Sequence, residues 1–421
     1  MLIGLVGKPS VGKSTFFKAA TLAEVEIASY PFTTIKAQHG VGYVKVDCID
    51  KEFNTQCNPN HGFCINHNRF VPIDIKDVAG LVPGASEGKG LGNKFLDDLR
   101  DADIFVYVVD VSGETDEGGK PTKDYNSCKD IEFLEDELNK WYYNILIKVW
   151  KGFARKTEME KSKFSEAVAK QFSGLKVNED DVKEVLLKLN FSEKPSTWKD
   201  EDIMKFASML RKISKPMIVA ANKCDRENSK ENIEKMKKEF SDLVIIPCSA
   251  DSELALREAA KAGLIDYIPG EDNFAPKGVQ PQGLRVPLMR PRDISEEIST
   301  KDKIKGDLNE KQKEALEKIK KNVLDVYGST GVQDILNKAV FDILGYLAIF
   351  PGSANKLGDS KGNILPDCFL LPPGSTALDF AFFLHTDFGK NFIKAIDART
   401  KRALGKNYEL KHRDALEIVT R

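Results

Sequence analysis

Short apolar runs alternate with amphipathic segments along the first half of the chain. Residues 2–6 form an apolar run that stops at Gly7, and residues 13–23 have the apolar spacing of a helix. Further runs typical of buried strands lie at 41–46, 70–76, 102–111, 217–221 and 243–247. Because strands that alternate with helices form parallel crossovers, this pattern predicts an α/β fold with a mostly parallel, doubly wound sheet.

The stretch between the strands at 102–111 and 217–221 is about a hundred residues long, too long for an ordinary connection. Its segments have helical spacing, with Glu and Lys on the polar side, at 130–153, 161–172, 179–189 and 199–212. Beyond it, residues 268–292 are polar and rich in Pro and Gly, as in a linker, and 309–327 has the pattern of a long charged helix. The sequence therefore predicts a helical insertion and a helical linker.

The C-terminal residues have the pattern of a separate small domain of short strands. In this domain we expect the aromatic residues of 380–387 to lie in the core and His385 to have a structural role. The expected division is a nucleotide domain at 1–125 and 214–290, a helical insertion at 126–213, a helical linker region at 291–345 and the small domain at 346–421.

Composition changes this picture little. The chain has 421 residues, of which 41% are hydrophobic and 30% charged, and its net charge is -1. No segment has the ~20 apolar residues that cross a bilayer, and the balanced charge gives no global attraction for nucleic acid. Gly7 begins a motif so early that we expect no signal peptide, and a cytoplasmic location follows. The seven cysteines are an odd number, which favours reduced thiols.

The segment from Gly7 to Ser14 has the sequence Gly-Lys-Pro-Ser-Val-Gly-Lys-Ser and lies between the first predicted strand and helix. This context predicts a phosphate-binding loop, because glycines let successive backbone N–H groups converge on phosphates. Lys13 would reach the β- and γ-phosphates, and the Ser14 hydroxyl would bind Mg²⁺. We expect nucleotide contacts from Gly7, Lys8, Pro9, Ser10, Val11, Gly12, Lys13, Ser14 and Thr15.

Two further segments have the positions expected of switch loops. Asp77 follows a predicted strand, where it could hold a Mg²⁺-bound water, and Gly80 could sense the γ-phosphate through its N–H. Between this segment and the phosphate-binding loop lie Thr33 and Thr34. We expect Thr34 to close on Mg²⁺, with Thr33 as the alternative.

The motif Asn222-Lys223-Cys224-Asp225 comes at the end of an apolar strand and indicates which base is bound. The Asp225 carboxylate could accept hydrogen bonds from guanine N1–H and N2–H₂, Asn222 could hold N7, and Lys223 could cover the base. Adenine does not offer this pair of donors, so the motif predicts GTP rather than ATP. Ser249 and Ala250, after the next strand, have the position of the last loop over the base.

Several segments resemble the YchF-type Obg-like GTPases, in their archaeal and eukaryotic branch. They are Tyr-Pro-Phe-Thr-Thr-Ile at 30–35, the run from Asp77 to Ala85, and Gly-Leu-Gly-Asn-Lys-Phe-Leu at 90–96. The run at 371–381 is similar to the core of a TGS domain, a β-grasp module associated with RNA and ribosome contacts. The resemblance covers nearly the whole chain and implies a P-loop GTPase domain with a helical insertion and a C-terminal TGS-like domain.

The resemblance implies a switch that binds GTP or GDP with Mg²⁺ and hydrolyses GTP slowly to GDP and phosphate, with a link to the ribosome or RNA. Lys13, Thr34 and Gly80 would be its catalytic residues, and Ser14, Thr34 and, through water, Asp77 would hold the Mg²⁺. Leu81 stands where many signalling GTPases have the glutamine that orients the attacking water, so slow hydrolysis is expected. We expect a monomer with neither a membrane nor a DNA partner.

Two alternatives remain open. The best-known YchF members lack the Lys and Asp of the base-reading motif and prefer ATP, so an ATPase is the first. The second is an RNA- or ribosome-binding module that a nucleotide stabilises without significant turnover. Ser10 stands where many Obg relatives have an Asn tied to monovalent cations, so we do not predict potassium dependence.

A Cys/His-rich stretch lies between two predicted strands. Cys57 and Cys64 are its centre, with Cys48, His61 and His67 nearby, but the spacing matches no standard zinc module. Two interpretations stand: a structural Zn²⁺ site, or a loop with free thiols and surface histidines.

Overall fold

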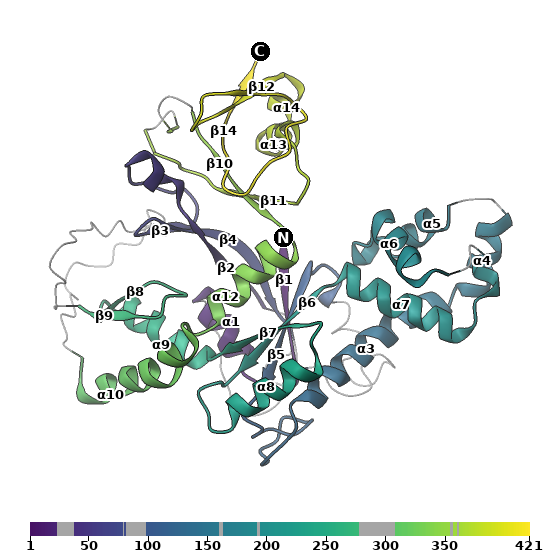
Figure 1. Cartoon of the computed structure of the whole chain (residues 1–421), viewed down its shortest axis with the longest axis horizontal. Helices are drawn as coiled ribbons and strands as arrows, with labels where there is room; N and C mark the ends of the chain where they lie inside the picture. Colours follow the sequence, from purple (N-terminus) through teal and green to yellow (C-terminus); the bar gives the residue numbers. More distant parts are fainter. Residues whose placement is uncertain are drawn as a thin grey trace. The chain divides into compact units, whose positions relative to one another are not determined.

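The computed structural model describes residues 1–22, 38–78, 80, 98–159, 163–191, 194–277, 308–353, 357–359 and 362–421 (Figure 1). These residues divide into two compact units. Unit 1 comprises Met1–Val41, Asp74–Arg257 and Leu316–Ile335, and unit 2 comprises Gly42–Ile73, Glu258–Ala315 and Leu336–Arg421. The boundary therefore falls inside two long strands, and each unit is built from segments far apart in the sequence.

A seven-stranded sheet has the strand order β2-β4-β1-β5-β6-β7, with β3 paired to β4. Its pairs β1–β4, β1–β5, β5–β6 and β6–β7 are parallel, which confirms the predicted doubly wound α/β fold. The strands are β1 Leu2–Val6, β2 Gln38–Asp47, β3 Phe63–Ile65, β4 Asn68–Asp77, β5 Ile104–Asp110, β6 Met217–Asn222 and β7 Val244–Cys248.

The centre of this sheet is fully buried. Every residue of β5 and β6 is buried, as expected for parallel strands covered by helices on both faces. Phe105 and Val219 belong to a core cluster that also contains Ile131 and Met236 from two of the covering helices. The helices around the sheet in unit 1 are α1 Lys13–Thr21, α3 Cys128–Ile147, α8 Ser229–Glu239 and α9 Ala250–Lys261.

The predicted helical insertion is confirmed in secondary structure. After α3 come α4 Trp150–Met159, α5 Phe164–Gln171, α6 Glu179–Leu189 and α7 Asp200–Ser214, and Figure 1 shows them gathered together. They have a core of their own, in which Trp150 stacks on Trp198 with ring centroids 5.4 Å apart. The start of α6 is fixed by a capping box, since Asn178 and Asp181 each accept the other's backbone N–H. The insertion is thus a packed layer rather than a long loop.

The expected linker at 268–292 contains regular structure. A two-stranded sheet pairs β8 Ile265–Tyr267 with β9 Phe274–Pro276, so the start of the stretch is a hairpin; residues 278–292 lie outside the described part. The predicted charged helix is present as α10 Glu310–Ile319, a π-helical turn at Lys320–Leu324 and α11 Asp325–Tyr327.

The C-terminal part of unit 2 has a five-stranded sheet in the order β11-β10-β14-β12-β13. Its strands are β10 Leu347–Pro351, β11 Phe369–Leu371, β12 Phe392–Asp397, β13 Ala403–Leu404 and β14 Ala415–Thr420. Helices α13 Ala377–Leu384 and α14 Thr386–Lys390 accompany the sheet, and α12 Val332–Asn337 precedes it. Phe380 joins Ile349 and Leu416 in the core. This mixed sheet with a crossing helix agrees with the expected β-grasp domain.

The prediction that the aromatics of 380–387 belong to the core is wrong for two of them. Phe382 is 46% exposed and Phe383 is 55% exposed, because a single short helix can bury only one face. His385 is exposed as well, and its Nδ1 accepts the backbone N–H of Asp387 at 3.1 Å, which caps α14. Its role is structural, but at a helix end.

No helix within the described part of the chain combines the length and the apolar composition that crossing a membrane requires.

Candidate nucleotide-binding site

The loop between β1 and α1 requires glycine at two positions. Gly7 has φ of +150°, and a Cβ there would lie 2.5 Å from the carbonyl oxygen of Val108. Gly12 has φ of +92°, and a Cβ there would lie 2.4 Å from Nδ2 of Asn222. Any side chain at either position would collide with its neighbours and strain the backbone. The strand, loop and helix thus have the local arrangement of a phosphate-binding loop.

Lys13 opens α1, and its side chain turns back over the loop. The Nζ atom donates a hydrogen bond of 2.8 Å to the backbone carbonyl of Lys8. Burial lowers the pKa of the Lys13 ammonium to about 8, while the charge of Asp77 acts in the opposite direction. A buried ammonium held by one carbonyl is well placed to bind an anionic phosphate. A bound phosphate would in turn favour the charged form of Lys13.

Asp77 ends β4 and is fully buried. Its Oδ2 accepts a hydrogen bond of 2.9 Å from the Ser14 hydroxyl, and its Oδ1 has no hydrogen-bond partner among the described residues. Burial raises the pKa of this carboxyl, against the effect of Lys13 and Ser14. A buried carboxylate oxygen without a partner, beside a hydroxyl, is a donor set that suits a hydrated Mg²⁺ ion. The residues present therefore fit the expected metal.

The switch residues are only partly covered by the structure. Thr33, Thr34 and Leu81 lie outside the described residues, so their roles remain predictions. Gly80 is described, and a Cβ on it would lie 3.0 Å from the Pro9 ring. Gly80 therefore lies directly beside the phosphate-binding loop, where the sequence motif places a γ-phosphate contact.

The base-recognition motif lies beside the same loop. Asn222 ends β6, and its side chain donates 2.8 Å to the carbonyl of Val11 and accepts 3.0 Å from the N–H of Ala250. Asp225 Oδ1 accepts a hydrogen bond of 2.8 Å from the Ser249 hydroxyl. One amide thus joins the phosphate-binding loop to the last loop, and the predicted base-binding residues come together in unit 1.

Asp110 contacts the predicted base-recognition motif, and sequence reasoning missed it. It ends β5 and forms an ion pair of 2.7 Å with Nζ of Lys223, within the base-recognition motif. Its carboxylate also accepts the hydroxyls of Ser112 and Thr115. Although burial opposes the shift, Lys223 and these hydroxyls lower the pKa of Asp110. The position at the carboxyl end of a central parallel strand is the signal that could have revealed it.

Lys8 is also held by residues that the motif did not predict. Its Nζ lies 2.9 Å from Asp130 Oδ2, donates 2.9 Å to the carbonyl of Thr115, and sits 4.0 Å from the centre of the Tyr125 ring. Because this side chain is committed to Asp130, a nucleotide contact from Lys8 would come through its backbone.

The last loop over the base has its own support. The N–H of Ser249 donates 2.9 Å to the carbonyl of Thr330, whose hydroxyl donates 2.6 Å to Glu253 in α9. Gly331, with φ of +82°, lies where a Cβ would be 2.0 Å from the carbonyl of Pro247. The segment just before α12 thus fixes the loop that carries Ser249, although no nucleotide motif marks it.

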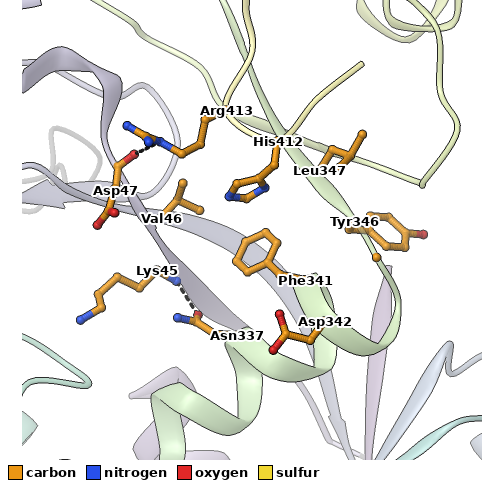
Figure 2. A pocket seen from close by; sticks show the side chains of 11 residues that line it. Lys45, Val46, Asp47, Asn337, Phe341, Asp342, Tyr346, Leu347, His412 and Arg413 are labelled. Carbon is orange, nitrogen blue, oxygen red and sulfur yellow. Dashed lines mark hydrogen bonds between the residues drawn. The ribbon is translucent and has the colours of Figure 1, made fainter. Parts of the chain in front are cut away.

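A pocket of about 500 Å³ lies elsewhere, in unit 2 (Figure 2). Lys45, Asp47, Phe341 and Arg413 contribute to its lining, and the Arg413 side chain donates 2.9 Å to the carbonyl of Asp47. Both signs of charge line it, whereas the glycine-rich loop of the predicted nucleotide site lies in unit 1. The phosphate-binding motifs of unit 1 therefore identify the nucleotide site better than cavity size does.

Known families match three parts of the chain. The family described as a 50S ribosome-binding GTPase matches residues 2–147, and the G4 motif-containing domain of the YGR210-like Obg-like GTPases matches residues 220–353. The TGS domain matches residues 361–420. A GTP-binding protein from Methanocaldococcus jannaschii is 46% identical over 420 residues, which cover 100% of this chain and 99% of that protein. The chain belongs to the YchF-type Obg-like GTPases.

Further comparisons agree with this membership. The crystal structure of a GTP binding protein from Pyrococcus horikoshii OT3 has a TM-score of 0.75 and 39% identity, with 100% of both chains covered. The ribosome-binding ATPase YchF of Bacillus subtilis is 31% identical over 270 residues, which cover 60% of this chain and 66% of that protein. Membership of this GTPase family implies a guanine nucleotide with Mg²⁺, and the three matched parts confirm the resemblance inferred from the sequence.

Proposed function

We propose that this YchF-type GTPase binds GTP with Mg²⁺, hydrolyses it slowly to GDP and phosphate, and uses the two nucleotide states as a switch. The observation that carries the proposal is the convergence of Lys13, Asp77 and Asn222 around one loop. Lys13 lies over the loop that would hold the phosphates, Asp77 offers an unused buried oxygen beside Ser14, and Asn222 links the loop to the base-recognition residues.

Each group of residues would have a role that follows from its chemistry. The N–H groups from Gly7 to Thr15 and the Lys13 ammonium would bind the phosphates, and the ammonium would stabilise charge that develops during hydrolysis. Ser14, Thr34 and, through water, Asp77 would hold Mg²⁺, which would neutralise phosphate charge when bound. The N–H of Gly80 would sense the γ-phosphate, so the two switch loops would differ between the GTP and GDP states.

Slow hydrolysis follows from the sequence at position 81. Leucine has no group that can orient water, so the intrinsic rate should not exceed that of GTPases without a partner, about 10⁻⁴ to 10⁻² per second. Single-turnover hydrolysis of radiolabelled GTP measures this rate. Lys13→Ala should abolish binding and turnover, whereas Thr34→Ala should slow GTP hydrolysis and leave GDP affinity unchanged. Full GTP binding and turnover by Lys13→Ala would rule out the proposed site.

An ATPase is the alternative function, since the Bacillus subtilis relative is named an ATPase. The deciding residue is Asp225, whose carboxylate is held by Ser249 at the base end of the site. Titration of the wild-type protein with GTP and ATP in parallel separates the alternatives. Equal affinities would favour the ATPase, and a clear preference for GTP would support the proposed switch.

We also propose a ribosome or RNA partner and a cytoplasmic location. The support is the TGS domain match at 361–420 and the ribosome-binding function named for the Bacillus subtilis relative. In this proposal the helical insertion at 126–213, the helical linker at 291–345 and the TGS-like domain at 346–421 transmit the state of a nucleotide domain at 1–125 and 214–290. The chain would act as a monomer.

The partner proposal is tested by sedimentation with ribosomal subunits in the presence of a non-hydrolysable GTP analogue, GDP or no nucleotide. Co-sedimentation that depends on the GTP analogue would support a ribosome-linked switch. Equal binding in all three conditions, together with no hydrolysis with or without ribosomes, would leave only a nucleotide-stabilised binding module.

A further inference from the structure

Three thiols and one carboxylate converge in unit 2. They lie in residues 48–69, which leave the sheet after β2 and return to it at the start of β4, and this segment is called the excursion below. Cys48, Asp50, Cys57 and Cys64 each offer one ligand atom, and these four atoms all lie within 4.8 Å of one another. Cys48 Sγ lies 3.6 Å from Cys57 Sγ, and Cys64 Sγ lies 3.9 Å from Asp50 Oδ2. Cys48, Asp50 and Cys57 are buried, and Cys64 is half-buried. No nucleotide motif accounts for this cluster.

The spacing of these atoms suits a tetrahedral metal ion. Zinc–sulfur bonds of about 2.3 Å at tetrahedral angles place two sulfurs about 3.8 Å apart. The 3.6 Å between Cys48 and Cys57 is close to this value. All seven cysteines are free, so no disulfide draws these sulfurs together. Sulfur-rich ligand sets select Zn²⁺ over the hard ions Mg²⁺ and Ca²⁺, and four protein ligands leave no position open for catalysis.

Neighbouring donors orient the ligands. His67 Nδ1 lies 2.8 Å from Asp50 Oδ1, and the backbone N–H of Cys57 donates 3.0 Å to Asp50 Oδ2. Arg69, which is buried, directs Nη1 at Cys57 Sγ from 3.7 Å. Three thiolates and a carboxylate carry more negative charge than one Zn²⁺ neutralises, so a buried guanidinium beside them is favourable. Such outer contacts are typical of metal sites, where they fix the ligands.

Part of the excursion has no regular secondary structure. Between η1 Ile49–Phe53 and β3, residues 54–62 form no helix or strand. Asn54 and His67 have positive φ, which favours tight turns over packed structure. Phe63 stacks on Phe70 with centroids 4.5 Å apart, but that contact lies at the base of the hairpin. Short segments with so small a core commonly need a metal or a disulfide to be stable.

The same excursion carries the contacts to residues 363–366, which precede β11. Asn58, next to Cys57, donates its backbone N–H to the carbonyl of Ile364 at 3.0 Å and pairs its side chain with Asn363 at 2.9 Å. Arg69 donates 3.0 Å hydrogen bonds to the carbonyls of Leu365 and Pro366. A metal ion that fixed the position of Cys57 would therefore also fix the loop that receives 363–366.

We propose that Cys48, Asp50, Cys57 and Cys64 form a closed site for a structural Zn²⁺ ion, which holds the 48–69 excursion in the shape that receives residues 363–366. The ligand set differs from the one considered from sequence. His67 contacts the carboxylate ligand instead of the metal, and His61 is not part of the cluster. The fourth proposed ligand is Asp50, which lies two positions after Cys48.

The metal content of the full chain tests the proposal directly. The protein is purified under reducing conditions without chelator, supplied with Zn²⁺, freed of excess ion and analysed by mass spectrometry of the metal. We expect about one Zn²⁺ per chain, and less than about a tenth of that for the Cys57→Ser, Cys64→Ser double variant. Cys368→Ala is the matched control, because it removes a buried thiol of the same unit outside the cluster and should keep the metal.

Co²⁺ used in place of Zn²⁺ reports the geometry and does not depend on whether the double variant folds. The wild-type protein should show intense visible d–d bands and a thiolate-to-cobalt band, which indicate a tetrahedral site with sulfur ligands. Chelation should raise hydrogen exchange at 54–66 and 362–366 while leaving the phosphate-binding loop unchanged. Wild-type protein without bound Zn²⁺, a weak octahedral Co²⁺ spectrum, or a mass 2 Da lower that reveals a disulfide would each overturn the proposal.

Discussion

The side-chain amide of Asn222 donates a hydrogen bond of 2.8 Å to the backbone carbonyl of Val11. The same amide accepts the N–H of Ala250, and Gly12 leaves just enough space for it. One side chain thus connects the phosphate-binding loop with the loop that covers the base. The two halves of the nucleotide site are held together even before a nucleotide adds its own contacts.

Asn222→Ala should therefore weaken the binding of phosphates as well as that of the base. Loss of the hydrogen bond to Val11 removes about 1 kcal/mol and frees the loop, so we expect at least about a fivefold lower affinity for inorganic tripolyphosphate, which has no base. Calorimetric titration measures both ligands. If only GTP binding fell and tripolyphosphate binding were unchanged, Asn222 would act on the base alone.

Asp225→Asn should remove the preference for guanine. The substituted amide cannot accept two hydrogen bonds at once from N1–H and N2–H₂, and charged hydrogen bonds contribute about 1.5–3 kcal/mol each. We expect GTP affinity to fall by at least about tenfold and ATP affinity to change little. Competition against a fluorescent GTP analogue gives both values. Cys128→Ser, which alters a buried residue of α3, serves as the control for general damage.

GTP binding should be strongest near neutral pH. The pKa of Lys13 is lowered to about 8 by burial, so the free protein loses this positive charge as pH rises through about 8, and GTP must then bind together with a proton. The pKa of Asp77 is raised by burial, so at low pH its carboxylate protonates and Mg²⁺ binding weakens. The affinity for GTP should therefore decline both above and below neutral pH.

Titration in buffers of different ionisation enthalpy measures the proton uptake. The Lys13→Arg variant separates the alkaline decline in GTP affinity from the acidic one. A guanidinium keeps its charge at high pH, so the alkaline decline should be flatter even if the variant binds GTP more weakly overall. Binding of GTP with no proton uptake at about pH 8.5 would contradict the role given to Lys13.

Lys8→Ala should destabilise unit 1, although the Lys8 side chain would not contact the nucleotide. Lys8 and Asp130 are both almost fully buried, and removal of one partner leaves an uncompensated charge. We expect a loss of about 3 kcal/mol in the free energy of unfolding, measured by urea denaturation.

Burial raises the pKa of Asp130, so protonation at low pH should recover part of the stability that the Lys8 variant loses. Lys8→Met combined with Asp130→Leu should be far milder than Lys8→Ala, because it leaves no buried charge. The exposed Lys183 pairs with Glu179 on α6, and Lys183→Ala should leave stability unchanged. Equal effects of the buried and the exposed substitution would show that the Lys8 pair is not essential.

Much of the fold could be predicted because its signals are local. The phosphate-binding loop occupies a strand, a turn and a helix within about twenty residues, and helix α6 lies at the residues that its periodicity predicts. Six of the seven strands of the large sheet agree with their apolar runs to within a few residues, and no run predicted β3 Phe63–Ile65. These features depend on backbone geometry and on side chains at a fixed spacing, both of which are written in neighbouring residues.

The sequence by itself determined the phosphate-binding loop, the base-recognition motif and the α/β class. Only the tertiary structure decided that Lys8 pairs with Asp130, that Asp110 holds Lys223, and that Asp50 rather than a histidine joins three cysteines. It also decided that Phe382 and Phe383 are exposed. The reason is physical. The path of the chain in space decides which distant residues come into contact and which side chains stay exposed, and neither hydrophobicity nor spacing along the sequence specifies that path.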